Sequence, residues 1–464
     1  MVPHTDIIAA ISTPAGVGGI AIVRLSGKGS IDLVDRIFKS PSGKKLVDAK
    51  ANTIHFGAIM KDGSVLDEVL VSVFHSPNSF TGEESIEISC HGSIYIQQGI
   101  LQLLLDTGAR LATAGEFTQR AFMNGKMDLS QAESVADLIA SSSAATHRLA
   151  MNQMRGGFSS KLIELRTELL NFASLIELEL DFSEEDVEFA NRDNLKRTAQ
   201  NIHGHIQKLA DSFALGNVVK TGIPVAIIGE TNAGKSTLLN LLLREEKAIV
   251  SDIHGTTRDV IEDTITIDGL MFRLIDTAGI RDTDDVVESL GIERTFKKME
   301  QANIVLWVVD AETEDEYAIA LSEKILPRVE GKKLILVFNK VDIIPAARKE
   351  SKELLLKDMI PDRIFISAKY HQGTDDLQTM LVEAANIPEF GEQDVIVTNM
   401  RHYEALRKAQ EAIERVSAGL ESGLSSDFIA QDIRECMHYL GEITGQISTD
   451  EILGNIFSKF CIGK

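Results

Sequence analysis

A phosphate-binding loop is the sequence feature that most constrains the fold. The stretch from Gly229 to Ser236 fits the pattern G-x-x-x-x-G-K-[ST]. An apolar run at 224–228 precedes it and is typical of a buried strand, and residues 237–242 are typical of a helix. Backbone N–H groups of such a loop surround a phosphate, the lysine reaches the outer phosphates, and the serine hydroxyl binds Mg²⁺. The pattern predicts a nucleotide site formed by Asn232, Ala233, Gly234, Lys235, Ser236 and Thr237.

Two later motifs favour guanine as the base. Asn339, Lys340 and Asp342 follow the apolar run 334–338. An Asp carboxylate there can accept two hydrogen bonds, from the N1–H and the exocyclic amine of guanine, whereas adenine offers no such pair. Sites of this kind reject analogues by roughly 10⁴–10⁵. Ser367, Ala368 and Lys369 follow another strand and suit backbone donation to the guanine O6. Each motif alone also fits a solvated loop, but their order after the phosphate loop predicts GTP.

The switch segments point to unusual catalysis. Asp276, Thr277, Ala278 and Gly279 follow the apolar strand 272–275. Asp276 would hold Mg²⁺ through water, and the Gly279 N–H would sense the γ-phosphate. A hydroxyl of Thr256 or Thr257 would bind Mg²⁺ when the triphosphate is present. Many GTPases carry a water-positioning Gln next, but here it is Ile280. Either hydrolysis is very slow, or the missing catalytic group comes from elsewhere.

The region 221–385 has the alternating pattern of a P-loop NTPase. We expect parallel strands at 224–228, 304–310, 334–338 and 363–367. A hairpin from Val260 to Ile275 should turn at Asp268-Gly269. This predicts a doubly wound sheet with ligands at the carboxyl ends of its strands.

The flanking regions predict an insertion. Residues 1–120 read as a mixed α/β domain, with strands at 20–25, 68–73 and 85–89 and a helix at 94–105. Residues 129–180, 401–420 and 426–440 have helical spacing. The 464 residues therefore suggest about three domains. The predicted boundaries are 1–120, 121–220 (helical, first half), 221–385 (GTPase) and 386–464 (helical, second half). Switch motions would reach the helices through both linkers.

Composition narrows the functional classes. A net charge of −22 argues against a broadly basic nucleic-acid coat, but not against a local basic patch. Three cysteines without a C-x-x-C pair favour a reducing compartment. The sequence has no secretory pattern and no apolar run near the ~18 residues of a membrane span, so we expect a cytoplasmic protein without membrane contact.

Several weaker signals have competing explanations. Cys90-His91 is half of a metal site or ordinary packing, and Trp307 is typical of a core position. Cys461 is a reactive thiol or a buried tail residue. Five basic residues form a tRNA-facing patch or are simply solvated: Arg110, Arg120, Lys126, Arg148 and Arg155.

Taken together, specific motifs resemble one family along essentially the whole chain. They are Gly18 to Gly27, Pro77 to Glu83, Gly115 to Thr118, Asn124 to Lys126, and the terminal Phe460 to Lys464 with its Cys-x-Gly-Lys ending. Thr256-Thr257 and the stretch Asp276 to Ile280 match as well. The chain resembles the MnmE (TrmE) family of tRNA-modification GTPases.

The resemblance implies a function that the motifs alone do not give. Members of this family work with a flavin-dependent MnmG (GidA) partner in a heterotetramer. Together they add an aminomethyl or carboxymethylaminomethyl group to C5 of the wobble uridine of certain tRNAs. The carbon comes from a tetrahydrofolate derivative, a 5-formyl or methylene form, and the amine from ammonium or glycine. GTP hydrolysis drives the conformational cycle, and the N-terminal domains form a homodimer.

The resemblance also assigns folate contacts. They map to Arg24, Glu87, Lys126 and Lys464. A pterin edge presents an N–H and amine pair that Glu87 can accept, and the anionic glutamate tail of the folate suits the three cations. Lys464 ends the chain, so the two ends must meet in space, within one chain or across the dimer.

Finally, the resemblance offers an explanation for Ile280. Family members close two GTPase domains face to face, with K⁺ in place of an arginine finger. The K⁺ ligands map to Asn232 and to the loop that contains Ser251, Asp252, Ile253, His254, Gly255 and Thr256. The water-orienting acid maps to Glu288, which would act through a bridging water beside Lys235 and Thr257. Without the family, Glu288 reads as one surface acid among several.

Two alternatives stay open at this point. The chain could be a regulatory switch such as a ribosome-assembly factor, although it has no RRM, KH or basic-tail signature. It could also be a folate-dependent aminomethyl-transfer protein with a vestigial GTPase. The intact Lys235, Ser236, Asp276 and Asp342 argue against the second alternative.

Overall fold

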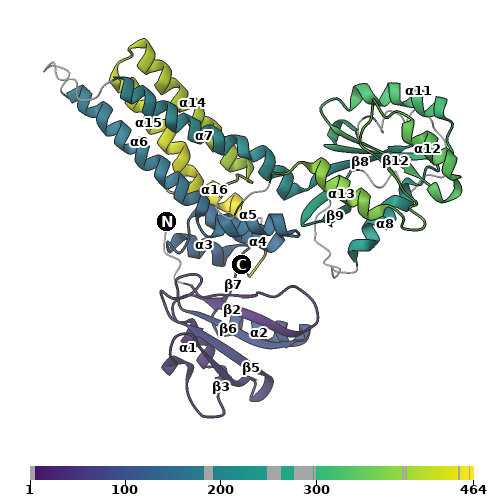
Figure 1. Cartoon of the computed structure of the whole chain (residues 1–464). Coiled ribbons are helices and arrows are strands. Elements are labelled where there is room, and N and C mark those ends of the chain that lie inside the picture. Colours follow the sequence, from purple (N-terminus) through teal and green to yellow (C-terminus); the bar gives the residue numbers. More distant parts are fainter. Residues whose placement is uncertain are drawn as a thin grey trace. The chain divides into compact units, whose positions relative to one another are not determined.

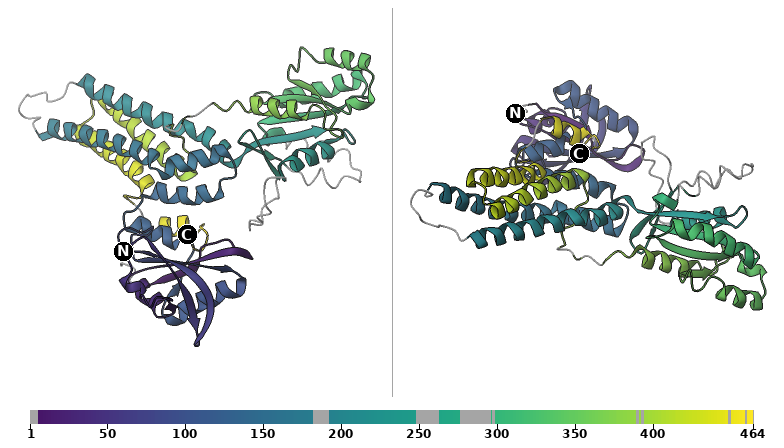
Figure 2. Two further views of the ribbon diagram at one scale, coloured as in Figure 1. Left: turned by 60° about the horizontal axis from the view of Figure 1, so that its bottom comes forward. Right: turned by 90° about the horizontal axis from the view of Figure 1, so that it is seen from above.

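The computed structural model describes residues 6–181, 192–247, 263–275, 296, 299–388, 391, 394–447, 450–458 and 460–463. Its contacts divide the chain into two compact units. Unit 1 contains residues 1–139, 150–206 and 405–464, and unit 2 contains residues 140–149 and 207–404. Figures 1 and 2 show the elements of each unit.

The N-terminal part of unit 1 is built on a seven-stranded sheet in the order β3-β4-β5-β6-β2-β1-β7. The strands are β1 Ile8–Ile11, β2 Gly18–Ser26, β3 Phe38–Lys39, β4 Thr53–Lys61, β5 Ser64–Phe74, β6 Ser85–Gly92 and β7 Arg110–Leu111. One face buries alternate apolar side chains against α1 (Ser30–Asp35) and α2 (Ile94–Thr107). A short 3₁₀ helix, η1, spans Leu46–Asp48, and α3 spans Glu116–Met123. The predicted strands and the predicted helix of this region are confirmed.

The remaining described elements of unit 1 are helices. They are α4 Leu129–Ala140, α5 Ala144–Met154, α6 Gly157–Asp181, α7 Arg192–Thr221, α14 Met400–Ser422, α15 Ser426–Thr444 and α16 Asp450–Ser458. Of these, α5, α7 and α14 are shared with unit 2. The long helices α6, α7, α14 and α15 lie side by side in both figures. On α6, Leu162, Leu165, Leu169, Phe172 and Ile176 are fully buried at three- and four-residue spacing. Such a stripe needs partner helices on one side, which explains the bundle.

The structure refines the predicted helical run 129–180. It contains three helices, because the chain leaves helical geometry at 141–143 and again at 155–156. The sequence carries a signal for each break: Ser141-Ser142-Ser143 at the first, and Gly156-Gly157 at the second. The predicted helices at 401–420 and 426–440 are confirmed as α14 and α15.

Unit 2 contains a six-stranded sheet in the order β13-β12-β11-β8-β10-β9. Its strands are β8 Ile223–Gly229, β9 Asp263–Ile267, β10 Leu270–Leu274, β11 Ile304–Asp310, β12 Lys333–Asn339 and β13 Arg363–Phe365. The helices are α8 Lys235–Lys247, α11 Asp315–Ile325, α12 Ala346–Leu354 and α13 Thr374–Ala385, with 3₁₀ turns η2 Leu326–Arg328 and η3 Val341–Ile343. The parallel pairing of β8, β11, β12 and β13 confirms that prediction.

Apolar side chains cover both faces of this sheet. One core joins alternate residues of β8, β11 and β12 to α8 and α13. The other joins the intervening residues, including Trp307, to α11 and to the segment that follows α12. The antiparallel β9–β10 hairpin turns at Asp268 and Gly269, as predicted. The expected doubly wound architecture is therefore observed.

The C-terminal tail, which is described up to residue 463, contacts the N-terminal region of the same chain. Ile462 bridges to Ala114, and the Ser12 hydroxyl donates to the Gly463 carbonyl at 3.1 Å. Gly463 has φ +94, and a Cβ there would lie 2.4 Å from the Ile11 carbonyl oxygen, so this close approach requires glycine. The tail is thus held beside β1, which pairs with β2.

Candidate functional site

The phosphate-binding loop lies between β8 and α8, as the sequence predicts. The Lys235 ammonium donates to the carbonyls of Gly229 and Glu230, at 2.8 and 2.5 Å. These contacts bend the side chain back over its own loop, toward the space in which a phosphate would sit. Ser236 and Thr237 are exposed in the first turn of α8, and Asn232 is exposed with φ +64.

Asn339 joins the phosphate loop to the predicted base-reading segments. Its side-chain amide donates to the Ala233 carbonyl at 2.9 Å, and its side-chain oxygen accepts from the Ala368 N–H at 3.0 Å. Gly234 has φ +91, and a Cβ there would lie 2.1 Å from Asn339 Nδ2. A buried amide satisfied on both sides fixes the distance between the two segments.

Asp342 and Ser367 contact each other within the predicted base-reading segments. The Ser367 hydroxyl, which is fully buried, donates to Asp342 Oδ1 at 2.5 Å. This contact orients an exposed carboxylate next to the loop that carries Ala368 and the exposed Lys369. The arrangement is one that can accept two donors from a planar base edge.

Other predicted residues of the GTP site lie outside the described residues. They are Ser251, Asp252, Ile253, His254, Gly255, Thr256, Thr257, Asp276, Thr277, Ala278, Gly279, Ile280 and Glu288. Their assignments stay predictions.

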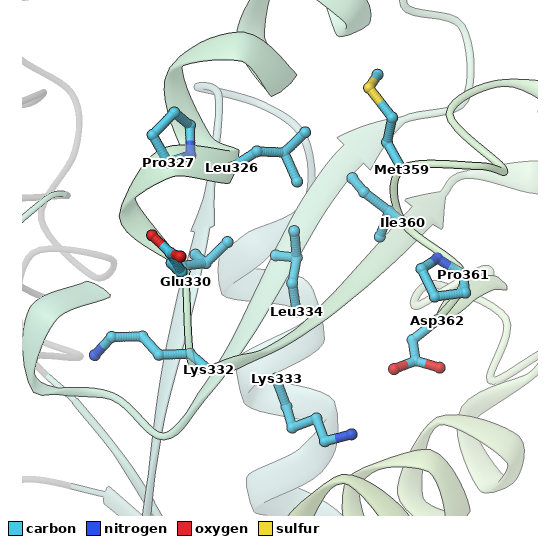
Figure 3. A pocket seen from close by; sticks show the side chains of 11 residues that line it. Leu326, Pro327, Glu330, Lys332, Lys333, Leu334, Met359, Ile360, Pro361 and Asp362 are labelled. Carbon is cyan, nitrogen blue, oxygen red and sulfur yellow. The ribbon is translucent and has the colours of Figure 1, made fainter.

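A cavity of about 510 Å³ lies elsewhere in unit 2 (Figure 3). Lys333 and Leu334 border it at the start of β12, and Asp362 borders it just before β13. These are the amino ends of the strands, whereas the phosphate loop and Asp342 follow carboxyl ends. The Lys332 ammonium on its rim donates to the Glu300 and Ala302 carbonyls, at 2.6 and 2.7 Å. The cavity is therefore separate from the candidate nucleotide site.

In unit 1, Arg24 and Glu87 form an ion pair. They face each other in register across β2 and β6, and Arg24 Nη2 lies 2.7 Å from Glu87 Oε1. The guanidinium also lies 5.5 Å from the Phe80 ring centre and 5.7 Å from that of Phe117. The sequence expectation placed Arg24 on an anionic tail. In the structure its charge is already balanced by Glu87, so its geometry suits orienting that carboxylate.

The loop from Ser76 to Glu84 links Arg24 to Lys126. The Lys126 ammonium donates to the Pro77 carbonyl at 3.0 Å, and Phe80 of the same loop lies beside Arg24. Asn124 holds the Thr81 carbonyl at 2.7 Å. Arg24 and Lys126 therefore border one loop, Glu87 pairs with Arg24, and Lys464 lies outside the described residues.

A buried ionic cluster supports this loop. Arg120 is 2% exposed and contacts Glu83, Glu116 and Asp6. Burial alone would raise the pKa of Glu116, but hydrogen bonds from Arg110, from the Thr113 N–H and from Arg120 outweigh it and lower the pKa to about 2. Arg120 therefore fits neither alternative given for the five basic residues, a tRNA-facing patch or a solvated side chain, because its side chain lies inside the domain.

The structure also shows where the residues behind the other weak sequence signals lie. Cys90 is buried, and its thiol lies 3.5 Å from the Ala21 carbonyl oxygen. His91 Nδ1 instead contacts the buried Asp67 at 2.7 Å. No cluster of three or more metal-binding side chains exists among the described residues. Trp307 is a core residue at 1% exposure, and Cys461 is exposed. No described helix is long and apolar enough to cross a bilayer.

Sequence reasoning missed the roles of Phe80, Phe117 and Glu83. All three occur in stretches that carry the family resemblance, but their contacts with Arg24 and Arg120 depend on tertiary packing. An aromatic residue inside a Gly- and Ser-rich loop, as at Phe80, was the one available signal.

Comparison with known proteins gives consistent matches along the chain. Residues 129–461 match the family model described as the MnmE helical domain, and residues 7–126 match that of the GTP-binding protein TrmE N-terminus. A tRNA modification GTPase MnmE from Bacteroides thetaiotaomicron is 60% identical over 465 residues, covering 99% of this chain and 100% of the relative. Its counterpart from Flavobacterium johnsoniae is 54% identical over 464 residues, covering 99% and 100%.

Among solved structures, an Aquifex aeolicus Era variant bound to GDP and AlF₄⁻ is 26% identical and covers 40% of this chain and 65% of that chain. The TM-score of 0.27 is too low for that likeness to carry an argument. The family model and the full-length relatives suffice: the chain belongs to the MnmE family of tRNA modification GTPases, and it is a GTPase that acts in tRNA modification.

Proposed function

We propose that this GTPase works with a flavin-containing MnmG-type partner to modify C5 of the wobble uridine in certain tRNAs. The product carries an aminomethyl or carboxymethylaminomethyl group, and its one-carbon unit comes from a tetrahydrofolate derivative. The protein acts as a homodimer in the cytoplasm. The observation that carries the proposal is the Arg24–Glu87 pair, because it fixes a partly exposed carboxylate against a guanidinium that lies beside the Phe80 and Phe117 rings.

The donor set around this pair fits a reduced folate. Glu87 can accept N–H groups of a pterin edge, and Arg24 holds the carboxylate in place. Phe80, at 38% exposure, offers a ring face at the mouth of the site. Lys126 supplies a cation for the anionic glutamate tail, and we assign Lys464 the same role. The folate supplies the carbon, while these residues bind and orient it.

The donor set of the phosphate loop fits GTP with Mg²⁺ and K⁺. Lys235 would contact the outer phosphates, and the Ser236 and Thr257 hydroxyls would hold Mg²⁺. Asn232 stands exposed at the loop tip, and it would hold K⁺ together with Ser251, Ile253 and Thr256. These oxygen ligands suit hard cations.

Hydrolysis then needs a group that orients water, because Ile280 cannot do so. We assign this role to Glu288, acting through a bridging water after two GTPase domains associate. A cation that stabilises charge in place of an arginine finger must supply part of the roughly 10³–10⁵-fold rate increase that such fingers give. The domain boundaries predicted from the sequence, with the GTPase inserted at 221–385, remain part of this proposal.

Calorimetry with 5-formyltetrahydrofolate tests the folate site. Glu87→Gln should weaken binding by roughly tenfold or more, because the amide cannot accept two donors at full charge. Deleting residues 461–464 should also abolish binding while GTP hydrolysis persists. Glu164→Gln, on the exposed surface of α6, is the matched control. Unchanged affinity in the Glu87 variant would remove this residue from the site.

A further inference from the structure

The carboxyl end of β11 carries a carboxylate that contacts Lys340 of the candidate base site. Asp310 ends β11 and stands in register with Asn339 at the end of β12. One of its carboxylate oxygens accepts the Glu312 N–H at 2.9 Å. The other lies 2.6 Å from the Lys340 ammonium. Both oxygens are therefore engaged, and the side chain has a defined orientation.

Cations from α12 hold this loop, residues 310–315, in place. Arg348 donates to the Glu312 carbonyl at 2.6 Å. The fully buried Lys352 donates to the Thr313 carbonyl and lies 2.6 Å from Asp315 Oδ1. A carboxylate on an anchored loop can hold a flexible partner at little further entropic cost.

Lys340 is the flexible partner. Its backbone is left-handed, with φ +64, between Asn339 and Asp342. Asn339 contacts the phosphate loop through Ala233, and Asp342 contacts Ser367. Because Lys340 lies between these two residues in the sequence, its side chain begins next to the base that they would bind. An unpaired lysine would sample many rotamers and lose that freedom on each binding event.

We propose that Asp310 is a positioning residue for guanine nucleotides, acting through Lys340. The ion pair holds the lysine in the arrangement that contacts the bound nucleotide, so binding does not have to order it. The inference rests on the proposed assignment of Asn339, Lys340 and Asp342 to the base site. It adds a residue outside every motif that predicted that site.

Dissociation of a fluorescent GDP analogue from the full-length protein tests the proposal. The pair is partly exposed, at 36% for Lys340 and 23% for Asp310, so Asp310→Asn should speed dissociation about two- to fivefold. The wild-type rate should rise with ionic strength more steeply than the variant's rate. Glu312→Gln, which removes another carboxylate of the loop and leaves the backbone contacts of Glu312 in place, is the control and should not change dissociation.

A double-mutant cycle separates positioning from a structural effect. If Asp310 acts through Lys340, adding Asp310→Asn to Lys340→Met should cause no further change. Additive effects, or an unchanged rate in Asp310→Asn alone, would overturn the inference while leaving the base site intact. If Lys340→Met and Asp342→Asn both bind like the wild type, the base-site assignment fails and the inference falls with it.

Discussion

At the scale of single residues, the proposed base site depends on one carboxylate that a buried hydroxyl orients. Ser367 is buried away from water, and its hydroxyl donates a hydrogen bond to Asp342. That bond leaves the exposed carboxylate facing outward with its charge intact. Guanine selectivity would therefore reside in Asp342, with Ser367 and Asn339 setting its position.

Exchanging this carboxylate should change the preferred base. Asp342→Asn replaces an acceptor with a donor, so GTP affinity should fall by roughly 10- to 100-fold, in line with about 1.5–3 kcal/mol for a charged hydrogen bond. Xanthosine triphosphate should gain affinity, because its C2 carbonyl accepts from the new amide. Competition binding with both nucleotides measures the switch. Unaltered GTP affinity would show that Asp342 does not read the base.

A second residue-scale prediction concerns pH. The pKa of Glu116 is lowered from 4.5 to about 2 in the folded protein, so the folded state favours its charged form. Its contribution to stability is fully present above about pH 4.5 and is lost as the pH falls toward 2. Glu116→Gln should lower the free energy of unfolding by on the order of 2–3 kcal/mol at neutral pH.

The same comparison at lower pH tests the cause. The stability gap between the wild type and Glu116→Gln should narrow between about pH 5 and pH 3, as read from denaturant unfolding. Glu164→Gln should show no comparable gap at either pH. A gap independent of pH would mean that packing, and not the charge network of Arg110 and Arg120, sets the effect.

These residues also mark what sequence reasoning can reach. Lys235, Asn339, Asp342 and Ser367 were predictable because each belongs to a short motif that follows a buried strand. The Arg24–Glu87 pair needed the register of β2 against β6, across 63 residues of chain. The Asp310–Lys340 pair likewise depends on the register of β11 against β12. Contacts set by tertiary register leave no local pattern to read.

At the scale of elements, strands and helices were predicted where their periodicity is strong. The four strands predicted to be parallel in unit 2 were found, and β8, β11 and β12 among them are apolar runs with buried side chains on both faces. β4 was missed because Gly57 and scattered polar residues blur its alternation. The short strands β1, β3 and β7 gave too few residues for a pattern.

The phosphate loop provides the element-scale prediction. Asn232 has φ +64, a conformation that Asn and Gly tolerate but Ala does not. Asn232→Gly therefore removes the side chain without backbone strain, and Asn232→Ala adds that strain. Both variants should lose most of the acceleration of GTP hydrolysis by K⁺ over Na⁺. Nucleotide binding by Asn232→Gly should stay within about threefold of the wild type, because one exposed contact is lost.

Steady-state hydrolysis in K⁺ and in Na⁺ measures this effect, with nucleotide affinity measured in parallel. Equal rates of the wild type in the two salts would exclude activation by K⁺. A K⁺ effect that survives in Asn232→Gly would move the cation to other ligands.

At the scale of the whole molecule, one chain combines a GTPase unit with a candidate one-carbon site in a separate unit. The family relation is full-length, so the GTPase unit and the unit with the candidate one-carbon site belong to one protein that acts in tRNA modification. A ribosome-assembly switch and a vestigial GTPase were the alternatives, and the family relation supports neither. The central claim is that GTP hydrolysis and a folate carbon serve the same modified uridine.

Nucleoside analysis of tRNA by mass spectrometry tests this claim most directly. A strain that lacks the protein should lose the aminomethyl and carboxymethylaminomethyl groups at C5 of wobble uridine. The wild type and Glu164→Gln should restore them, whereas Lys235→Ala, which should impair GTP binding, and Glu87→Gln, which should weaken folate binding, should restore less. The account is contradicted if the deletion strain keeps both modified nucleosides at wild-type levels.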